Sequence, residues 1–412
     1  MRSTKINIYS CLHYLSIILL IIASICFYNL ETMSTYLTMC MGSMLLSIGA
    51  TGFERGFRIM QEKGIKYILL LYSIYTFYGL LFLRAGDYNW DFQIFSCVQS
   101  ICFYFSCRHF FSFHDWYKKL AMPFMIGGLF VVFYIFTLQQ EIIMMAQVEE
   151  RVGEGLSGNV NTVGYSLGIV SFAITYYYCV TKKKWIFLAL IPVLFMMLLT
   201  GSKKTVIIIV IDIMTLYVYG KAKVSSFLKL AILFSVLVWV VLEVPYFYEV
   251  IGKRIEDMYT TLTGSGSGDY SHSTDDRNGM ISDAFRLGMN YPIFGGGMNY
   301  FAAASKMFGY YGYSHCNYTE LFCNFGIVGV LIYYVPYFKN IRFFWRLRKQ
   351  EWERSIFVIL WLVMSLILGW AMVAFSGLSN SYMPIMASFA MMESVKLKYK
   401  YVKNTNIAQA VA

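Results

Sequence analysis

Apolar runs decide the fold of this chain, as in Ser16-Ile-Ile-Leu-Leu-Ile-Ile-Ala23 and again in Val206-Ile-Ile-Ile-Val-Ile211. Each run lies within a stretch that approaches the roughly 20 residues an α-helix needs to cross the hydrocarbon core of a bilayer. Of the 412 residues, 58% are apolar and 14% are charged, against roughly 45–50% and 25% in a typical soluble domain. We therefore predict an all-α polytopic membrane protein in which residues 1–412 form a single integral membrane domain.

These apolar segments recur along the whole chain and predict about twelve transmembrane helices. The helices are expected at residues 11–30, 34–52, 66–83, 92–111, 121–139, 160–180, 185–200, 204–220, 227–244, 314–338, 355–375 and 379–397. Lys and Arg orient them, because cytoplasmic loops carry an excess of these residues. With the N-terminus in the cytoplasm, 25 of the 34 basic residues fall on the cytoplasmic side and 9 outside. Both termini are therefore predicted to be cytoplasmic.

The formal net charge of +11 raises the question of a nucleic-acid partner. Nucleic-acid-binding domains carry their basic residues in a contiguous patch or stripe, whereas here they fall in short clusters between apolar segments. We therefore predict contact with membrane lipid and no contact with nucleic acid. The nine cysteines form no C-x-x-C pair and have no histidine at metal-ligand spacing, so no metal site and no cofactor are predicted.

One connection is far longer than the others, at residues 245–313 between the ninth and tenth predicted helices. The orientation places it outside the cell, and loops of this length are usually functional or disordered. Residues 247–262 have helical spacing, and Gly264-Ser-Gly-Ser-Gly268 is typical of a flexible linker.

The second half of this loop has helix and turn signals of its own. Asp275 and Asp276 could cap a helix that begins near Arg277. That helix is expected to end before Tyr291-Pro292, because the residue preceding proline disfavours the helical region. The glycines of Gly295-Gly-Gly297 then predict a tight turn. We expect a partly helical external loop that caps the bundle.

Polar side chains gather where this loop enters the tenth predicted helix, in Ser314-His-Cys-Asn-Tyr-Thr-Glu320. Asn317, Glu320 and Asn324 follow at helical spacing, and polar side chains on one face of a membrane helix usually face a cavity or the bundle interior. His315 titrates near neutral pH and could act there as a general base or an oriented hydrogen-bond donor. The alternative is an interfacial histidine that only caps the helix.

Basic residues on the predicted outer side are further candidates. Arg277, at the start of the loop helix, could hold an anion together with the backbone amides; a solvated ion pair is the alternative. Lys203 and Lys204 in Gly201-Ser-Lys-Lys-Thr205 depart from the positive-inside pattern, although such lysines also snorkel to the interface. Asp212 lies near mid-bilayer, where a carboxylate is a functional candidate, but we favour a buried structural acid.

The order of these motifs resembles a known family. The motifs are Gly201-Ser-Lys-Lys at the start of a helix, a long loop with Arg277, Pro292-Ile-Phe-Gly-Gly-Gly297, His315-Cys-Asn-Tyr-Thr-Glu320 and Gly326-Ile-Val-Gly329. In this order they are similar to the superfamily of O-antigen ligases and Wzy-type O-antigen and capsular polysaccharide polymerases of the bacterial envelope. Taken alone, Gly326 and Gly329 are typical of small-residue packing between membrane helices.

The resemblance implies a glycosyltransferase that acts on undecaprenyl-diphosphate-linked oligosaccharides at the outer face of the cytoplasmic membrane. His315 would deprotonate or orient an acceptor hydroxyl, and Arg277 and Lys203 would hold the pyrophosphate as its charge grows. The family's usual Ser-Arg is Ser-Lys here; lysine keeps the charge but loses the bidentate fork, so Lys204 could share the role. The side chains expected to bind substrate beside them are Asn317 and Glu320. No metal is required.

Three functions remain open from the sequence. The first is a polymerase that joins repeat units, which we favour because such sequences are the more numerous and diverse. The second is a ligase that transfers finished polymer to a terminal acceptor. The third is a flippase for lipid-linked oligosaccharide, which would show two related halves that we do not find. A chain-length regulator protein is a candidate partner for the polymerase.

Overall fold

The structure is a computed structural model of the full chain. It describes residues 8–28, 31–86, 90–112, 119–145, 152–153, 156, 160–219, 228, 232, 235–236, 239–253, 269–309, 312–375 and 379–411. Within these ranges, only the backbone is described at 90–92, 142, 144–145, 203, 247, 250–251, 269–275, 379–380 and 400–411.

Helices dominate the described residues, which form no strand beyond one isolated bridge between Leu83 and Met298. The α-helices are α1 (Ile8–Cys26), α2 (Met33–Thr51), α3 (Phe53–Met60), α4 (Lys63–Leu81), α5 (Trp90–Phe111), α6 (Ala121–Leu138), α7 (Gln140–Met145), α8 (Val160–Thr181), α9 (Lys184–Leu199), α10 (Lys203–Tyr219), α12 (Pro245–Phe247), α14 (Asp269–Gly288), α15 (Tyr300–Ala304), α16 (Asn317–Leu347), α17 (Trp352–Gly369) and α18 (Met383–Val411). Short π or 3₁₀ turns cover Tyr248–Gly252, Ser305–Phe308 and Ser379–Tyr382.

The all-α membrane fold predicted from the sequence is supported by these helices. Every predicted transmembrane segment except 227–244 coincides with a described helix, although the ends differ. Among the described residues, seven helices are long and apolar enough to cross a membrane, namely α1, α2, α4, α6, α8, α16 and α17. Residues 227–244 lie largely outside the described part of the chain, so the total of twelve stays a prediction.

Helix α8 lies at the centre of the bundle, where it packs against α6, α9, α10 and α1. Glycines allow these close approaches. A Cβ added to Gly168 of α8 would lie 2.2 Å from the Ile208 side chain of α10, and a Cβ on Gly128 of α6 would lie 2.2 Å from Val170. Small residues of this kind let membrane helices approach closely, so the N-terminal end of α8 is held beside the start of α10.

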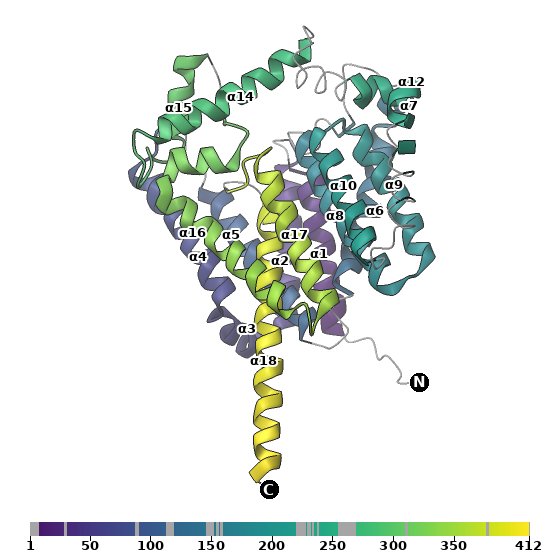
Figure 1. The fold of residues 1–412 in the computed structure, drawn as a ribbon, viewed down its shortest axis with the longest axis vertical. Coiled ribbons are helices and arrows are strands. Elements are labelled where there is room, and N and C mark those ends of the chain that lie inside the picture. The colour runs from purple at the N-terminus through teal and green to yellow at the C-terminus, as the bar shows by residue number, and fades with distance from the viewer. Residues whose placement is uncertain are drawn as a thin grey trace.

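Helix α14 crosses the end of the bundle above α16, opposite the chain's C-terminus (Figure 1). It begins at Asp269, so the predicted start near Arg277 was wrong, because the polar stretch before Asp275 is itself helical. Its end at Gly288 agrees with the expected stop before Pro292. Earlier in the loop, helical structure is described as far as residue 253, and the predicted linker at 264–268 lies outside the described residues.

The predicted glycine turn inserts into a break in α16. Gly326 has φ +64°, a conformation that favours glycine, and a Cβ there would lie 2.3 Å from the Ile293 carbonyl oxygen. The interruption frees backbone groups, and the Ile327 N–H donates to the Pro292 oxygen over 2.9 Å. Glycine at 326 therefore serves the turn, and its interpretation as a helix–helix packing residue was wrong.

The same turn is held from its other side by the end of α4. The Arg84 Nε donates to the Gly296 carbonyl oxygen over 2.7 Å, and the Tyr78 hydroxyl donates to the Phe294 carbonyl oxygen over 2.8 Å. The loop that carries α14 and α15 is thus fixed to both α4 and α16.

Charged side chains at the opposite end of α4 form a buried network. Arg108 of α5 donates to both carboxylate oxygens of Glu62, with Nε–Oε2 at 2.8 Å and Nη2–Oε1 at 2.9 Å. The Tyr104 hydroxyl donates to the same carboxylate over 2.6 Å, and the remaining side of the guanidinium bonds Ser394 of α18. This network joins α4, α5 and α18.

Candidate active site

A cleft of about 350 Å³ lies at the α14 end of the bundle. Its polar lining includes Lys204 of α10, Asn299, Tyr313 and Glu320 of α16, and its apolar lining includes Met372 and Phe375, which follow α17. Clefts with a few polar groups set in apolar walls are the usual form of a ligand site. The residues come from distant parts of the sequence, so only the assembled bundle forms it.

His315 lies in a tight turn beside this cleft, directly before α16. Its φ is +60°, an uncommon conformation for a residue with a side chain, and such conformations persist only where the surroundings enforce them. Buried Ser314 holds His315 in this conformation. Its N–H donates to the Glu320 Oε2 over 2.5 Å, and its hydroxyl donates to the Cys316 carbonyl oxygen over 3.1 Å. The ring centroids of His315 and Tyr313 are 4.3 Å apart.

Electrostatics bring His315 together with two cations. Burial is the largest cause that lowers the pKa of His315 to about 4, and the positive charges of Arg277 and then Lys204 lower it further. Arg277 also lies within electrostatic range of Lys204. The imidazole is therefore neutral at pH 7, and Arg277 of α14 and Lys204 of α10 lie within electrostatic range of it.

Lys204 reaches the cleft because the chain reverses sharply between α9 and α10. Gly201 has φ +57°, and the Thr205 hydroxyl donates to the Ser202 carbonyl oxygen over 2.6 Å. Gly164 of α8 makes room for this turn, since a Cβ there would lie 2.9 Å from the Thr205 side chain. Helix α10 then begins at Lys203, one residue before the predicted start at 204; the Lys203 side chain lies outside the described part of the structure.

Arg277 stands in the interior of α14, well past the first turn that begins at Asp269. The expectation that it shares an anion site with the amides of a helix N-terminus was therefore wrong. Its side chain is half-buried, and no carboxylate among the described side chains pairs with it. The described residues thus give no support to a solvated ion pair.

Asn317 lies behind the cleft and not in it, and its side chain is 1% exposed. Its Oδ1 accepts the N–H groups of Ala374 and Phe375 over 2.6 and 2.8 Å, and its Nδ2 donates to the Tyr334 hydroxyl over 2.7 Å. Both amide atoms are thereby engaged within the protein. The side chain expected to contact substrate instead holds the apolar wall formed by the segment after α17.

Asp212 is buried in the bundle and has a partner that the sequence did not identify. The Ser171 hydroxyl of α8 donates to the Asp212 Oδ2 over 2.7 Å. A hydrogen-bonded carboxylate between α8 and α10 fits the structural interpretation of Asp212.

Several cleft residues were missed from the sequence. Asn161 and Thr162 at the start of α8 line it, as does Asn299, whose Nδ2 donates to the Ala85 oxygen over 3.0 Å. The first two are polar residues at the end of a predicted membrane helix, but they carry no charge, and it was the unusual placement of a positive charge that singled out Lys203. The apolar wall had no such signal, because apolar residues after α17 look like membrane helix.

The fold and the site define a class: an all-α membrane protein with a cleft at one end of its bundle, where Lys204 lines the cleft and His315 and Arg277 lie within electrostatic range of it. Residues 186–334 match a family model described as O-antigen ligase, which confirms the resemblance read from the motifs. The matched segment runs from α9 into α16 and contains Lys203, Lys204, Arg277 and His315. It supports a function in envelope polysaccharide synthesis of the ligase or polymerase type. No curated protein matches the sequence significantly.

Proposed function

We propose that the protein is a polysaccharide polymerase that joins undecaprenyl-diphosphate-linked oligosaccharide repeat units. The observation that carries the proposal is that Lys204 lines the cleft beside the turn of His315, and that Arg277 lies within electrostatic range of both residues. Glycosyl transfer from a diphosphate carrier needs a group that accepts a proton and cations that hold a leaving group of growing negative charge. This site supplies both.

In the proposed reaction, a sugar hydroxyl of one lipid-linked repeat unit attacks the anomeric carbon of the chain on another carrier. A new C–O bond forms, the bond from that carbon to the pyrophosphate oxygen breaks, and undecaprenyl diphosphate leaves with the bonding electrons. The hydroxyl proton passes to a ring nitrogen of His315. Arg277, Lys204 and Lys203 hold the pyrophosphate and stabilise its developing charge.

The low pKa of His315 comes from burial and from the charges of Arg277 and Lys204. A base with a pKa near 4 accepts protons weakly, and an efficient general base has a pKa near the operating pH. A bound pyrophosphate would offset the charges of Arg277 and Lys204, which lower that pKa, and so raise it toward neutrality. Donor binding would thus prepare His315 to accept the proton of the acceptor.

In this proposal, Glu320 and Asn317 hold other parts of the site in position. Glu320 holds the turn of His315 through the Ser314 N–H, and it also borders the cleft. Asn317 holds the wall formed by Ala374 and Phe375. Neither role requires a metal, because the cations supply the charge neutralisation.

The test is an assay of purified full-length protein with lipid-linked repeat units alone. A polymerase yields a ladder of longer lipid-linked chains and releases undecaprenyl diphosphate, and the proposal expects this in EDTA as well. A ligase leaves repeat units unextended but transfers preformed polymer to a different acceptor. A flippase moves lipid-linked oligosaccharide across vesicles without forming a bond. Either of the last two results overturns the polymerase, and activity lost to EDTA and restored by magnesium overturns metal independence.

The proposal also places the cleft and residues 245–313 outside the cytoplasmic membrane, with both termini in the cytoplasm. Introduced cysteines near Lys118 and Ser267, labelled in whole cells by an impermeant reagent after removal of interfering native cysteines, test this orientation. We expect labelling near Ser267 and none near Lys118. Labelling near Lys118 alone would show the opposite orientation. A chain-length regulator is a further candidate partner, to be sought by co-purification.

A further inference from the structure

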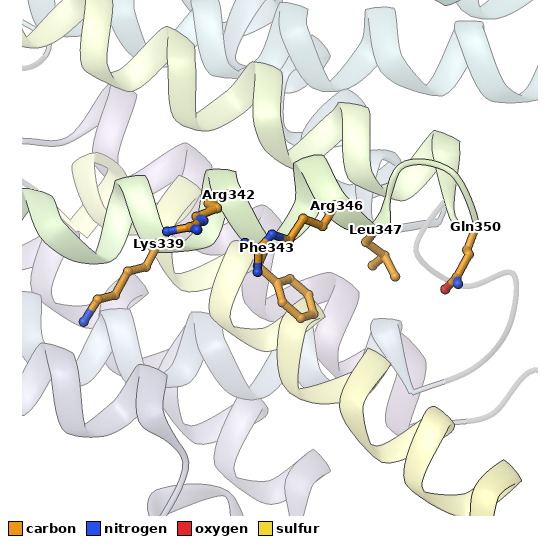
Figure 2. Close-up of a pocket in the computed structure, with 6 residues that line it drawn as sticks. All are labelled: Lys339, Arg342, Phe343, Arg346, Leu347 and Gln350. Atoms are coloured by element: carbon orange, nitrogen blue, oxygen red, sulfur yellow. The ribbon is translucent and has the colours of Figure 1, made fainter.

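A second groove, of about 560 Å³, lies along the part of α16 that is remote from the His315 cleft. Figure 2 shows its six lining residues on and just after α16, with α18 (yellow) nearby: Lys339, Arg342, Phe343, Arg346, Leu347 and Gln350. The sequence prediction ended this helix at residue 338, where hydrophobicity stops, but α16 continues to Leu347 because Lys and Arg are good helix formers.

The groove gathers like charges that the described residues do not neutralise. Lys339, Arg342 and Arg346 follow at helical spacings of three and four, which places them on one face, and all three are exposed. None makes an ion pair with a described carboxylate. Glu351, the next carboxylate along the chain, is already engaged by Lys398 over 2.6 Å and Arg354 over 3.6 Å.

The surroundings of the groove are those of a bilayer surface. Lys339 directly follows the apolar stretch of α16, which ends at Phe338, and lysines at the end of an apolar membrane helix extend to the bilayer surface. Phe338 is 59% exposed and Trp345 is 53% exposed. Tryptophan is typical of the membrane interface, and the Arg348 guanidinium lies 3.8 Å from the Trp345 ring centroid.

We propose that this groove binds the phosphate of an anionic glycerophospholipid, such as phosphatidylglycerol, in the leaflet opposite the His315 cleft. Arg342 and Arg346 offer planar forks that fit phosphate oxygens in pairs, and Lys339 adds a point charge. Phe343 and Leu347 lie between these cations and can contact the glycerol and the first acyl carbons. A lipid fits better than a soluble anion because the exposed aromatic residues beside the groove also need apolar contact.

Quenching of tryptophan fluorescence tests the proposal with the full-length protein in phosphatidylcholine vesicles. Brominated phosphatidylglycerol is added in rising fraction, and comparison with Trp345→Phe isolates the signal of Trp345. We expect quenching at fractions where brominated phosphatidylcholine has little effect. The triple variant K339Q/R342Q/R346Q should lose this preference by about 100-fold, since each cation near a membrane surface is worth about fivefold in binding.

The control triple K182Q/K183Q/K184Q removes the same charge between α8 and α9, at the same end of the bundle, and should keep the preference. Equal losses in both triples would mean general surface charge and would overturn the proposal. No preference in the unaltered protein, or full competition by free glycerol 3-phosphate, would overturn it as well. If K339Q/R342Q/R346Q does not insert into the membrane, the single variants Arg342→Gln and Arg346→Gln should each lose about fivefold of the preference for brominated phosphatidylglycerol.

Discussion

The two ends of the bundle treat their cations in opposite ways. Arg108 donates to both oxygens of Glu62 and to Ser394, so its charge is neutralised within the protein. Arg277, Lys204 and His315 lie within electrostatic range of one another, and neither cation forms an ion pair with a described carboxylate.

The difference separates charges that hold the fold from charges that await a ligand. A buried cation with a bidentate carboxylate has its desolvation offset by its partner, and loss of either partner is strongly destabilising. Cations that lie near each other without a carboxylate partner repel and gain nothing from folding. They become favourable when an anion such as a pyrophosphate binds between them, so mutations at the two ends should have different consequences.

The largest effect on turnover is expected at His315. His315→Ala should lower polymer formation per inserted molecule by about 10²–10⁴-fold, the usual contribution of a general base, while lipid-linked donor still binds. The measurement is polymer ladder length and repeat-unit accumulation in cells, normalised to membrane-inserted protein. His315→Asn separates chemistry from backbone, because asparagine tolerates the left-handed conformation but cannot accept the proton. Normal ladders from well-expressed His315→Ala would remove the catalytic assignment.

The next largest effect is expected at Arg277, on donor binding as well as on turnover. Arg277→Ala is expected to raise the KM for the donor about 10- to 100-fold, the cost of roughly 1.5–3 kcal/mol for a hydrogen bond to a charged group. Arg277→Lys should recover only part, because an ammonium lacks the paired geometry. The matched control is Arg286→Ala on the same helix, where the side chain is 78% exposed and lies 3.6 Å from Asp283. Equal effects at both positions would contradict the prediction.

The pH dependence should reveal the cations around His315. Because the imidazole must be neutral to accept a proton, activity falls as pH drops through its pKa, which is about 4 in the free enzyme. The acid limb of kcat/KM should therefore lie near pH 4, and that of kcat at higher pH, because bound pyrophosphate raises the pKa. Lys204→Gln should move the kcat/KM limb to higher pH. An acid limb that stays at the same pH in this variant would show that the charge of Lys204 does not act on the pKa of His315.

The smallest effect on turnover is expected at the paired end of the bundle. Arg108→Met should leave turnover per inserted molecule unchanged but destabilise the protein by about 3–5 kcal/mol, because Glu62 is left without its cation. Thermal inactivation of purified protein measures this loss. The double variant R108M/E62Q should recover part of it. A loss of turnover without a loss of stability would break the distinction between the two ends.

Hydropathy alone placed most of the helices, because crossing the membrane requires about 20 apolar residues whatever their neighbours are. Helix ends were less predictable. Helix α16 runs beyond residue 338 into a basic segment, and α14 begins at Asp269, well before the predicted cap. A helix continues as long as its residues tolerate helical dihedrals, so neither the end of hydrophobicity nor an aspartate fixes its limit.

The sequence by itself determined the membrane class, the resemblance and the candidates His315, Arg277, Lys203 and Lys204, because apolar run length and motif order are local properties of a chain. Only the tertiary structure decided which of them meet. It brought Lys204 and Arg277 within range of His315, and turned Asn317 toward the segment after α17. The physical reason is that a charge or an amide acts on whatever lies within a few ångströms of it, and those neighbours come from distant helices that packing alone brings together.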